Sequence, residues 1–107
     1  MYVTREQAIL REAEAALIWN YITESSGASF SVAFAKVTGD HPASISKRSD
    51  RCYMFVEGTG TMRVGEEIHH VSGGDVVYIP KGTEHALSGD ISYYLVNNPP
   101  FRKEDRT

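Results

Sequence analysis

The sequence has little cysteine and no long hydrophobic run, and each scarcity excludes a class of protein. Its one cysteine, Cys52, excludes an internal disulfide, so the chain carries no sign of an oxidising compartment. No apolar stretch approaches the ~20 residues that a transmembrane helix needs. The first residues also lack the charged and then apolar layout of a signal peptide. We therefore expect a cytoplasmic protein.

Basic charge is scarce as well. The 107 residues include 11 Lys and Arg against 14 Asp and Glu, which gives a formal net charge of −3. A nucleic-acid-binding domain normally presents a basic surface, and so does a polybasic membrane-surface module. The composition therefore predicts that neither nucleic acid nor membrane is a partner. The length fits one domain.

The start of the chain has the pattern of a helix. Thr4 and Gln7 have the spacing of a capping box, in which an N-cap side chain and the third helical residue bond to each other's backbone. Residues 5–16 are rich in Ala, Glu, Leu and Arg, which favour helices. Their apolar members fall on one helical stripe. We expect residues 1–17 to form an N-terminal helical extension.

From residue 18 onward the chain changes to short β-branched and aromatic segments separated by Gly-, Ser- and Asp-containing breaks, a pattern typical of strands and turns. The expected strands are 18–23, 30–38, 52–57, 60–64, 68–71, 76–79, 85–87 and 91–97. Short strands at regular spacing predict a β-sandwich or barrel rather than a βαβ sheet. We expect this barrel domain over residues 18–101, followed by a charged tail at 102–107.

The segment 74–85, GDVVYIPKGTEH, carries the most specific pattern in the chain, with two glycines, a proline and a final histidine at fixed spacing. It resembles the second motif of the cupins, and the segment 53–60, YMFVEGTG, resembles the end of their first motif. The resemblance covers roughly residues 30–101. It implies an all-β cupin jelly-roll β-barrel, here with a short N-terminal α-helix, and a homodimer as the usual assembly of such short chains.

The same resemblance points to a missing metal site. Cupins usually bind a divalent metal through two His separated by one residue, a Glu four residues later and the final His of the second motif. Counting back from Glu57, the first three positions fall on Ile45, Lys47 and Arg51, so only His85 remains as a ligand. Lys and Arg at neutral pH offer N–H donors and no lone pair. We therefore predict no metal and no other cofactor.

A rebuilt metal site is the alternative to this prediction. His41 precedes a proline in the segment that enters the barrel, and Asp50 is the carboxylate nearest to the expected ligand positions. Either of them, together with His85, would offer lone pairs to a divalent metal. The sequence leaves this possibility open.

A different kind of site follows from the alternation of side chains along an extended chain. The residues with the parity expected to face the barrel interior beside His85 are Ile45, Lys47, Arg51, Tyr53 and Phe55. Two cations are costly to bury without an anion, and a barrel of ~8 strands can enclose a small ligand. We interpret the chain as a metal-free, small-molecule-binding cupin whose cavity suits a small acidic metabolite: a carboxylate, a sugar acid or a phosphate.

Two other interpretations remain open. In the first interpretation, the barrel is an enzyme. It is either an isomerase or cyclase that uses His85 and Tyr53 as acid and base, or a metal-dependent dioxygenase with a rebuilt site around His85. The second is a structural dimer module with a filled interior. The fold alone does not choose among them, because one fold hosts many chemistries.

Overall fold

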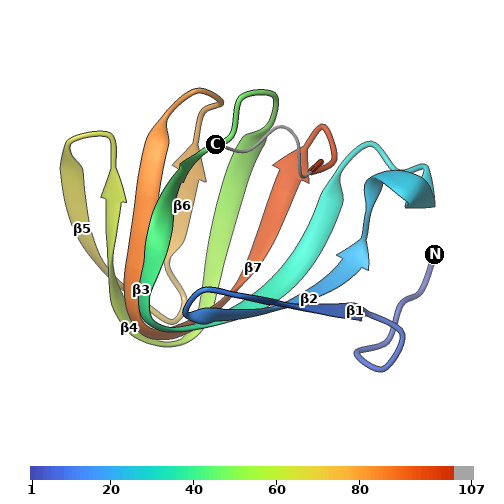
Figure 1. Ribbon diagram of the computed structural model, residues 1–107, viewed down its shortest axis with the longest axis horizontal. Coiled ribbons are helices and arrows are strands. Elements are labelled where there is room, and N and C mark those ends of the chain that lie inside the picture. The colour runs from blue at the N-terminus through green and yellow to red at the C-terminus, as the bar shows by residue number, and fades with distance from the viewer. Residues whose placement is uncertain (103–107) are drawn as a thin grey trace.

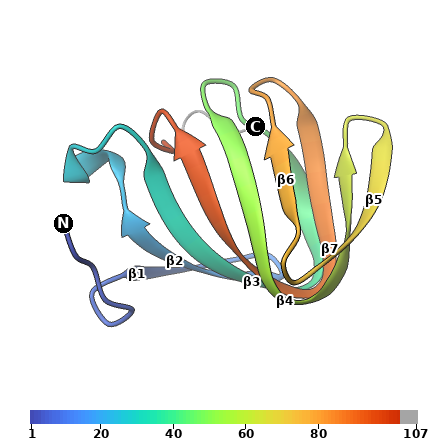
Figure 2. The same cartoon turned by 180° about the vertical axis from the view of Figure 1, so that it is seen from behind.

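The computed structural model describes residues 1–102 as one curved antiparallel sheet of seven strands (Figures 1 and 2). The strands are β1 (Ile9–Ala13), β2 (Ala16–Ile22), β3 (Ser31–Ile45), β4 (Asp50–Val64), β5 (Glu67–Ser72), β6 (Val76–Ile79) and β7 (Glu84–Asn98). A short 3-10 helix, η1 (Glu24–Ser26), connects β2 to β3. The all-β class is confirmed. No helix among these residues is long and apolar enough to cross a membrane.

The strands follow the order β1-β2-β3-β7-β4-β5, and β6 pairs with the first part of β4. The three central strands, β3, β7 and β4, are each 15 residues long. They curve strongly along their length, so that β6 lies beside the start of β4 and β5 beside its end (Figure 1). The sheet thereby closes around an interior, as the barrel prediction requires.

The curvature coincides with three glycines that meet across the central strands. Gly89 of β7 pairs with Gly39 of β3 on one side and with Gly60 of β4 on the other. A Cβ on Gly89 would lie 2.6 Å from the Cα of Gly60, and the φ angle of Gly89 is 132°, which side-chain-bearing residues rarely adopt. Only residues without a side chain allow the strands to approach this closely.

Gly58 and Gly89 also explain an error in the expected strands. The segments 52–57 and 60–64 are continuous in β4, and the segments 85–87 and 91–97 are continuous in β7. The glycines between them bend the strands without ending them. Of the charged tail predicted at 102–107, all but Arg102 lies outside the described residues.

The predicted helix over residues 1–17 is wrong. The capping contacts of Thr4 and Gln7 do form, with the Thr4 amide 2.9 Å from Gln7 Oε1, but they belong to a single turn. The chain then enters β1, which pairs with β2 and extends the sheet. Helix propensities differ by less than ~1 kcal/mol per residue, so strand pairing and the packing of Ala13 on the core outweigh them. Residues 9–17 therefore belong to the barrel.

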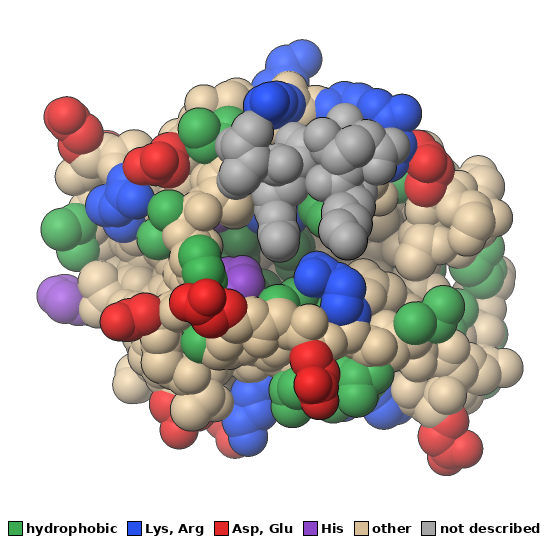
Figure 3. Space-filling view, viewed as in Figure 1, with side chains coloured by type: hydrophobic (Ala, Val, Ile, Leu, Met, Phe, Trp, Pro, Cys, Tyr) green, Lys and Arg blue, Asp and Glu red, His purple; other side chains and the backbone are tan. Residues whose placement is uncertain are grey.

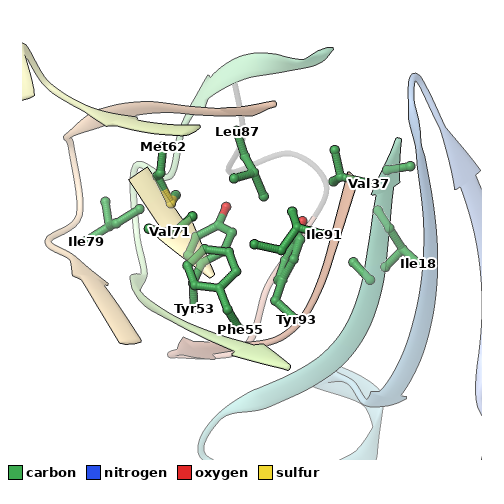
Figure 4. Packing of buried hydrophobic residues seen from close by; sticks show 12 residues of the cluster. Ile18, Val37, Tyr53, Phe55, Met62, Val71, Ile79, Leu87, Ile91 and Tyr93 are labelled. Atoms are coloured by element: carbon green, nitrogen blue, oxygen red, sulfur yellow. The ribbon is translucent and has the colours of Figure 1, made fainter. Parts of the chain in front are cut away.

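The core lies inside the curved sheet and is formed by alternate residues of the long strands (Figure 4). The rings of Tyr53, Phe55 and Tyr93 gather at its centre, with Met62 and Ile91 beside them. Burial of apolar surface stabilises a fold by roughly 25 cal/mol per Å², and this cluster accordingly holds the two ends of the sheet together around the interior.

Candidate functional site

A cavity remains in the interior, against the inner faces of β2, β3, β4 and β7. The space open to the centre of a water molecule is about 60 Å³, several times the ~10–15 Å³ that one water needs. The cavity exists because the inward residues of β3 on this side are small, namely Ser31, Ala33 and Ala35. The larger rings of Tyr53 from β4 and Tyr93 from β7 also line the cavity.

Arg51, the second residue of β4, lines this cavity although only 6% of its surface is exposed. Its Nε donates to Oδ1 of Asn97, the residue opposite on β7, at 2.7 Å. Its Nη1 lies 3.0 Å from Nε2 of His85 and 3.5 Å from the Tyr53 hydroxyl. No carboxylate of residues 1–102 forms an ion pair with Arg51. Neutral acceptors therefore surround a buried positive charge.

His85, the last residue of the second motif and the second residue of β7, is 2% exposed. Its Nδ1 lies 2.9 Å from the carbonyl oxygen of Thr83, so Nδ1 carries the proton and Nε2 accepts from Arg51. Burial lowers the pKa of His85 to about 4, against the effect of the Thr83 hydrogen bond and with the help of the Arg51 charge. At neutral pH, His85 is an uncharged acceptor whose Nε2 lone pair is used in the hydrogen bond from Arg51.

The aromatic side of the cavity is formed by stacked rings. The centroid of Tyr53 lies 4.9 Å from that of Tyr93 and 6.1 Å from that of Phe55 (Figure 4). Burial raises the pKa of Tyr93, and the neighbouring Tyr53 adds to this rise, so Tyr93 presents a neutral hydroxyl. Phe55 does not line the cavity; it supports the ring of Tyr53 from the core.

Four of the residues singled out from the sequence come together here. Arg51 and Tyr53 line the cavity directly. His85 contacts both of them, through the hydrogen bond to Arg51 and an edge-to-face arrangement with the Tyr53 ring at 5.9 Å. Phe55 completes the group from behind.

The other two residues lie elsewhere. Ile45 is half-buried and does not line the cavity, and Lys47 is exposed. The expected alternation fails because β3 shifts register between His41 and Ser44, and because the chain bends directly after Ser46. The inward orientation expected for Lys47 is therefore wrong, and one cation of the predicted pair is missing from the interior.

The donor set does not fit the divalent metal that cupins usually hold. His41 lines the cavity, but its Nδ1 lies 2.8 Å from the carbonyl oxygen of Glu14. Asp50 lies outside the cavity and accepts from the Lys81 amide at 2.9 Å, which lowers its pKa. Among residues 1–102, no three His, Cys, Asp or Glu side chains are grouped closely enough to hold a metal ion.

Sequence reasoning missed Asn97 and Arg11, which both line the cavity. The signal for Asn97 was available, because it shares the parity of Tyr93 on the last strand. Arg11 was missed because its segment was predicted to be a helix. The cavity lining includes no Asp or Glu of the described residues, whereas acidic and basic side chains are interspersed on the outer surface (Figure 3).

A small rolled antiparallel sheet with a partly polar interior cavity defines a jelly-roll barrel. The Cupin domain model matches residues 32–92, and the chain belongs to the cupin family. Uncharacterized protein MJ1618 of Methanocaldococcus jannaschii is 29% identical over 110 residues, which cover 97% of this chain and 83% of that protein.

Solved structures agree on the fold. Pac13 of Streptomyces, described as a nucleoside dehydratase and also determined with uridine, matches with a TM-score of 0.88 and 21% identity, covering 100% of this chain and 88% of that one. Ectoine synthase from P. lautus matches with a TM-score of 0.86 and 16% identity, over 100% and 88% of the two chains. At these identities the similarity establishes the fold alone.

Proposed function

We propose that this chain is a metal-free, small-molecule-binding cupin whose cavity takes a small acid: a carboxylate, a sugar acid or a phosphate. The observation that carries the proposal is the buried guanidinium of Arg51, which contacts neutral acceptors and no carboxylate within residues 1–102. A buried charge without a counter-charge is costly. An anionic ligand offsets that cost and so binds more tightly than a neutral analogue of the same shape.

The guanidinium is also oriented for such a ligand. Asn97 holds its Nε and His85 holds its Nη1. Within the described part of the chain, no hydrogen bond involves Nη2, and no fully buried side-chain nitrogen or oxygen there lacks a partner. Nη2 is therefore reachable, and its two N–H groups are available to a carboxylate or phosphate in charge-assisted hydrogen bonds.

The proposal is tested by a thermal-shift screen of organic acids, sugar acids and phosphates, together with elemental analysis of the protein as purified. We expect acids to raise the melting temperature and matched neutral analogues, such as lactamide for lactate, to have little effect. We also expect no stoichiometric Fe, Mn, Ni or Zn. A stoichiometric transition metal, or equal shifts with acids and neutral analogues, would contradict the proposal.

A metal-independent enzyme is the second candidate, because Tyr53 and His41 both line the cavity and both side chains can transfer protons. Pac13 and ectoine synthase, whose structures are similar, are enzymes by their descriptions. His85 is less suited to the role of base proposed from the sequence, since both of its ring nitrogens have protein partners. Conversion of a bound acid, followed by NMR and lost in Tyr53→Phe, would establish this candidate.

We also propose that two copies of the chain pair through the outer face of β6, β4, β7 and β3. Exposed or half-exposed apolar side chains lie in register across these strands: Val76 beside Met54, Met54 beside Tyr94, and Tyr94 beside Phe34. A second copy would bury the same row on both partners, as a two-fold interface does. Light scattering coupled to size exclusion tests this assembly.

A further inference from the structure

The buried Arg51 belongs to a cross-strand row of three polar side chains. Ser31 of β3 is paired with Asn97 of β7, and Asn97 is paired with Arg51 of β4. Residues directly opposite each other in a sheet point to the same face, and all three line the cavity. Their exposed fractions are only 6%, 4% and 6%. Three adjacent strands therefore present one buried polar side chain each to the same part of the interior.

The position of Phe101 shows that the two ends of this row lie close together. Its backbone amide donates to Oγ of Ser31 at 2.9 Å, and the centroid of its ring lies 5.8 Å from Cζ of Arg51. One residue thus contacts both ends of the row, and it also lines the cavity. A ligand group about as large as one side chain can therefore contact Ser31 and Arg51 at the same time.

Each side chain of the row has a hydrogen-bond donor that the described part of the chain does not use. Asn97 accepts from Arg51 through Oδ1, and no hydrogen bond of residues 1–102 involves its Nδ2 or Nη2 of Arg51. Ser31 accepts from the Phe101 amide through Oγ, which leaves its hydroxyl proton to donate. No fully buried side-chain nitrogen in these residues lacks a partner, so Nδ2, like Nη2, borders the open space of the cavity.

The number and the placement of these donors favour a tetrahedral oxyanion over a planar one. Two N–H groups on Nη2, two on Nδ2 and one hydroxyl exceed the ~four lone-pair sites of a carboxylate, which lie in one plane. A phosphoryl group offers three strong acceptor oxygens that point to different sides. Three oxygens can thus accept from donors on three adjacent strands together. No Asp or Glu of residues 1–102 lines the cavity, so none of them repels the second negative charge of a phosphate.

We propose that the ligand is a small phosphate monoester, and that Ser31, Asn97 and Arg51 each bind one of its phosphoryl oxygens. The inference rests on the proposed function, since it presupposes that Arg51 anchors an acid. It narrows that acid to a phosphate and assigns Ser31 and Asn97 as the residues that select it.

The test compares phosphate monoesters with carboxylates of the same chain length by isothermal titration calorimetry. At pH 7.5 a phosphate monoester carries nearly two negative charges. The pairs are ethyl phosphate with butyrate, and glycerol 3-phosphate with 3,4-dihydroxybutyrate. An apolar and a polar pair are used because the next cross-strand row has members of both kinds: Asn20, Ala33, Leu95 and Tyr53. We expect the better phosphate to bind about tenfold or more tightly than its carboxylate, the effect of one further hydrogen bond to a charged group.

Ser31→Ala removes one donor without changing any charge, and it should remove most of this preference. Ser29→Ala is the control, because Ser29 is exposed and does not line the cavity; it should leave the preference unchanged. Equal affinities for phosphates and carboxylates in the wild type would overturn the phosphate inference and leave the proposed function intact. A preference that survives Ser31→Ala would reflect charge alone and would also overturn it. Failure of every acid of both series to bind would contradict the proposed function and, with it, this inference.

Discussion

The guanidinium nitrogen Nη1 of Arg51 lies 3.0 Å from Nε2 of His85. The positively charged guanidinium therefore faces the lone pair of the histidine that matches the cupin metal motif. The other ring nitrogen of His85 bonds to Thr83. An imidazole nitrogen that accepts from a guanidinium has no lone pair left for a metal. In this barrel, the positive charge at the site therefore belongs to a side chain.

Asn97→Asp should weaken acid binding by about tenfold or more, because the new carboxylate would lie 2.7 Å from Nε of Arg51 and compete with an anionic ligand. Asn98→Asp makes the same change in charge at the next residue of β7, which is exposed, and should have little effect. Titration calorimetry with the best acid of the screen measures both variants. Equal affinities in the two variants would show that Arg51 does not anchor the ligand.

The stability of the protein should fall as the pH is lowered from about 6.5 to about 4. The pKa of His85 is about 4 in the folded protein and ~6.5 in an unfolded chain. Between these values the unfolded state binds the extra proton, so stability is fully present above pH 6.5 and is lost on acidification. The loss is on the order of 3 kcal/mol over the whole window.

Urea unfolding at several pH values from 7.5 to 4.5 checks this expectation. His69→Gln, which removes an exposed histidine, should retain the loss of stability, and His85→Gln should lose most of it. A wild-type protein that is as stable at pH 4.5 as at pH 7.5 would contradict the assignment of His85 as a buried, neutral acceptor.

Gly89→Ala should destabilise the barrel by about 3 kcal/mol or more, since its Cβ would lie 2.6 Å from the Gly60 Cα and its φ of 132° is unfavourable for alanine. Gly27→Ala is the matched control. Gly27 also has a positive φ, 78°, but a Cβ there would meet nothing within 4 Å, so a cost of only about 1–2 kcal/mol is expected. Equal losses in urea unfolding would mean that close packing at the bend is unimportant.

Val76→Glu should dissociate the proposed homodimer, because it places a charge on the apolar outer row of β6 and β4. Ile68→Glu is the control on β5, outside that row. The two side chains are similarly exposed, at 63% and 64%, so both changes alter the surface equally. Light scattering should give a monomer mass for the first variant and a dimer mass for the second. A monomeric wild type, or dissociation by both variants, would exclude this interface.

The fold could be predicted from the motif of residues 74–85 because its glycines and proline determine turns, and turns depend on local backbone geometry. The first strand, β1, could not be predicted from the sequence. Residues 9–13 favour a helix locally, and β1 forms only because β2 lies beside it with unpaired backbone groups. Such pairing is a tertiary effect that helix propensity does not report.

The candidate site was predictable to the extent that strand alternation held. It held along β4, where Arg51, Tyr53 and Phe55 are all buried. It failed beyond the end of β3, where a register shift and a bend leave Lys47 exposed. Arg11 could not be found, because its role depends on β1. The cavity therefore does contain a second basic side chain, but this is Arg11 of β1 and not Lys47.

The central claim is that the guanidinium of Arg51, and no metal ion, binds the acid. The most direct measurement is calorimetric titration of the wild type and of Arg51→Gln with the best acid from the screen, in the presence and absence of EDTA. The account predicts the same affinity with and without EDTA for the wild type, and a loss of binding in Arg51→Gln. Binding that disappears with EDTA, or that persists in Arg51→Gln, would contradict it.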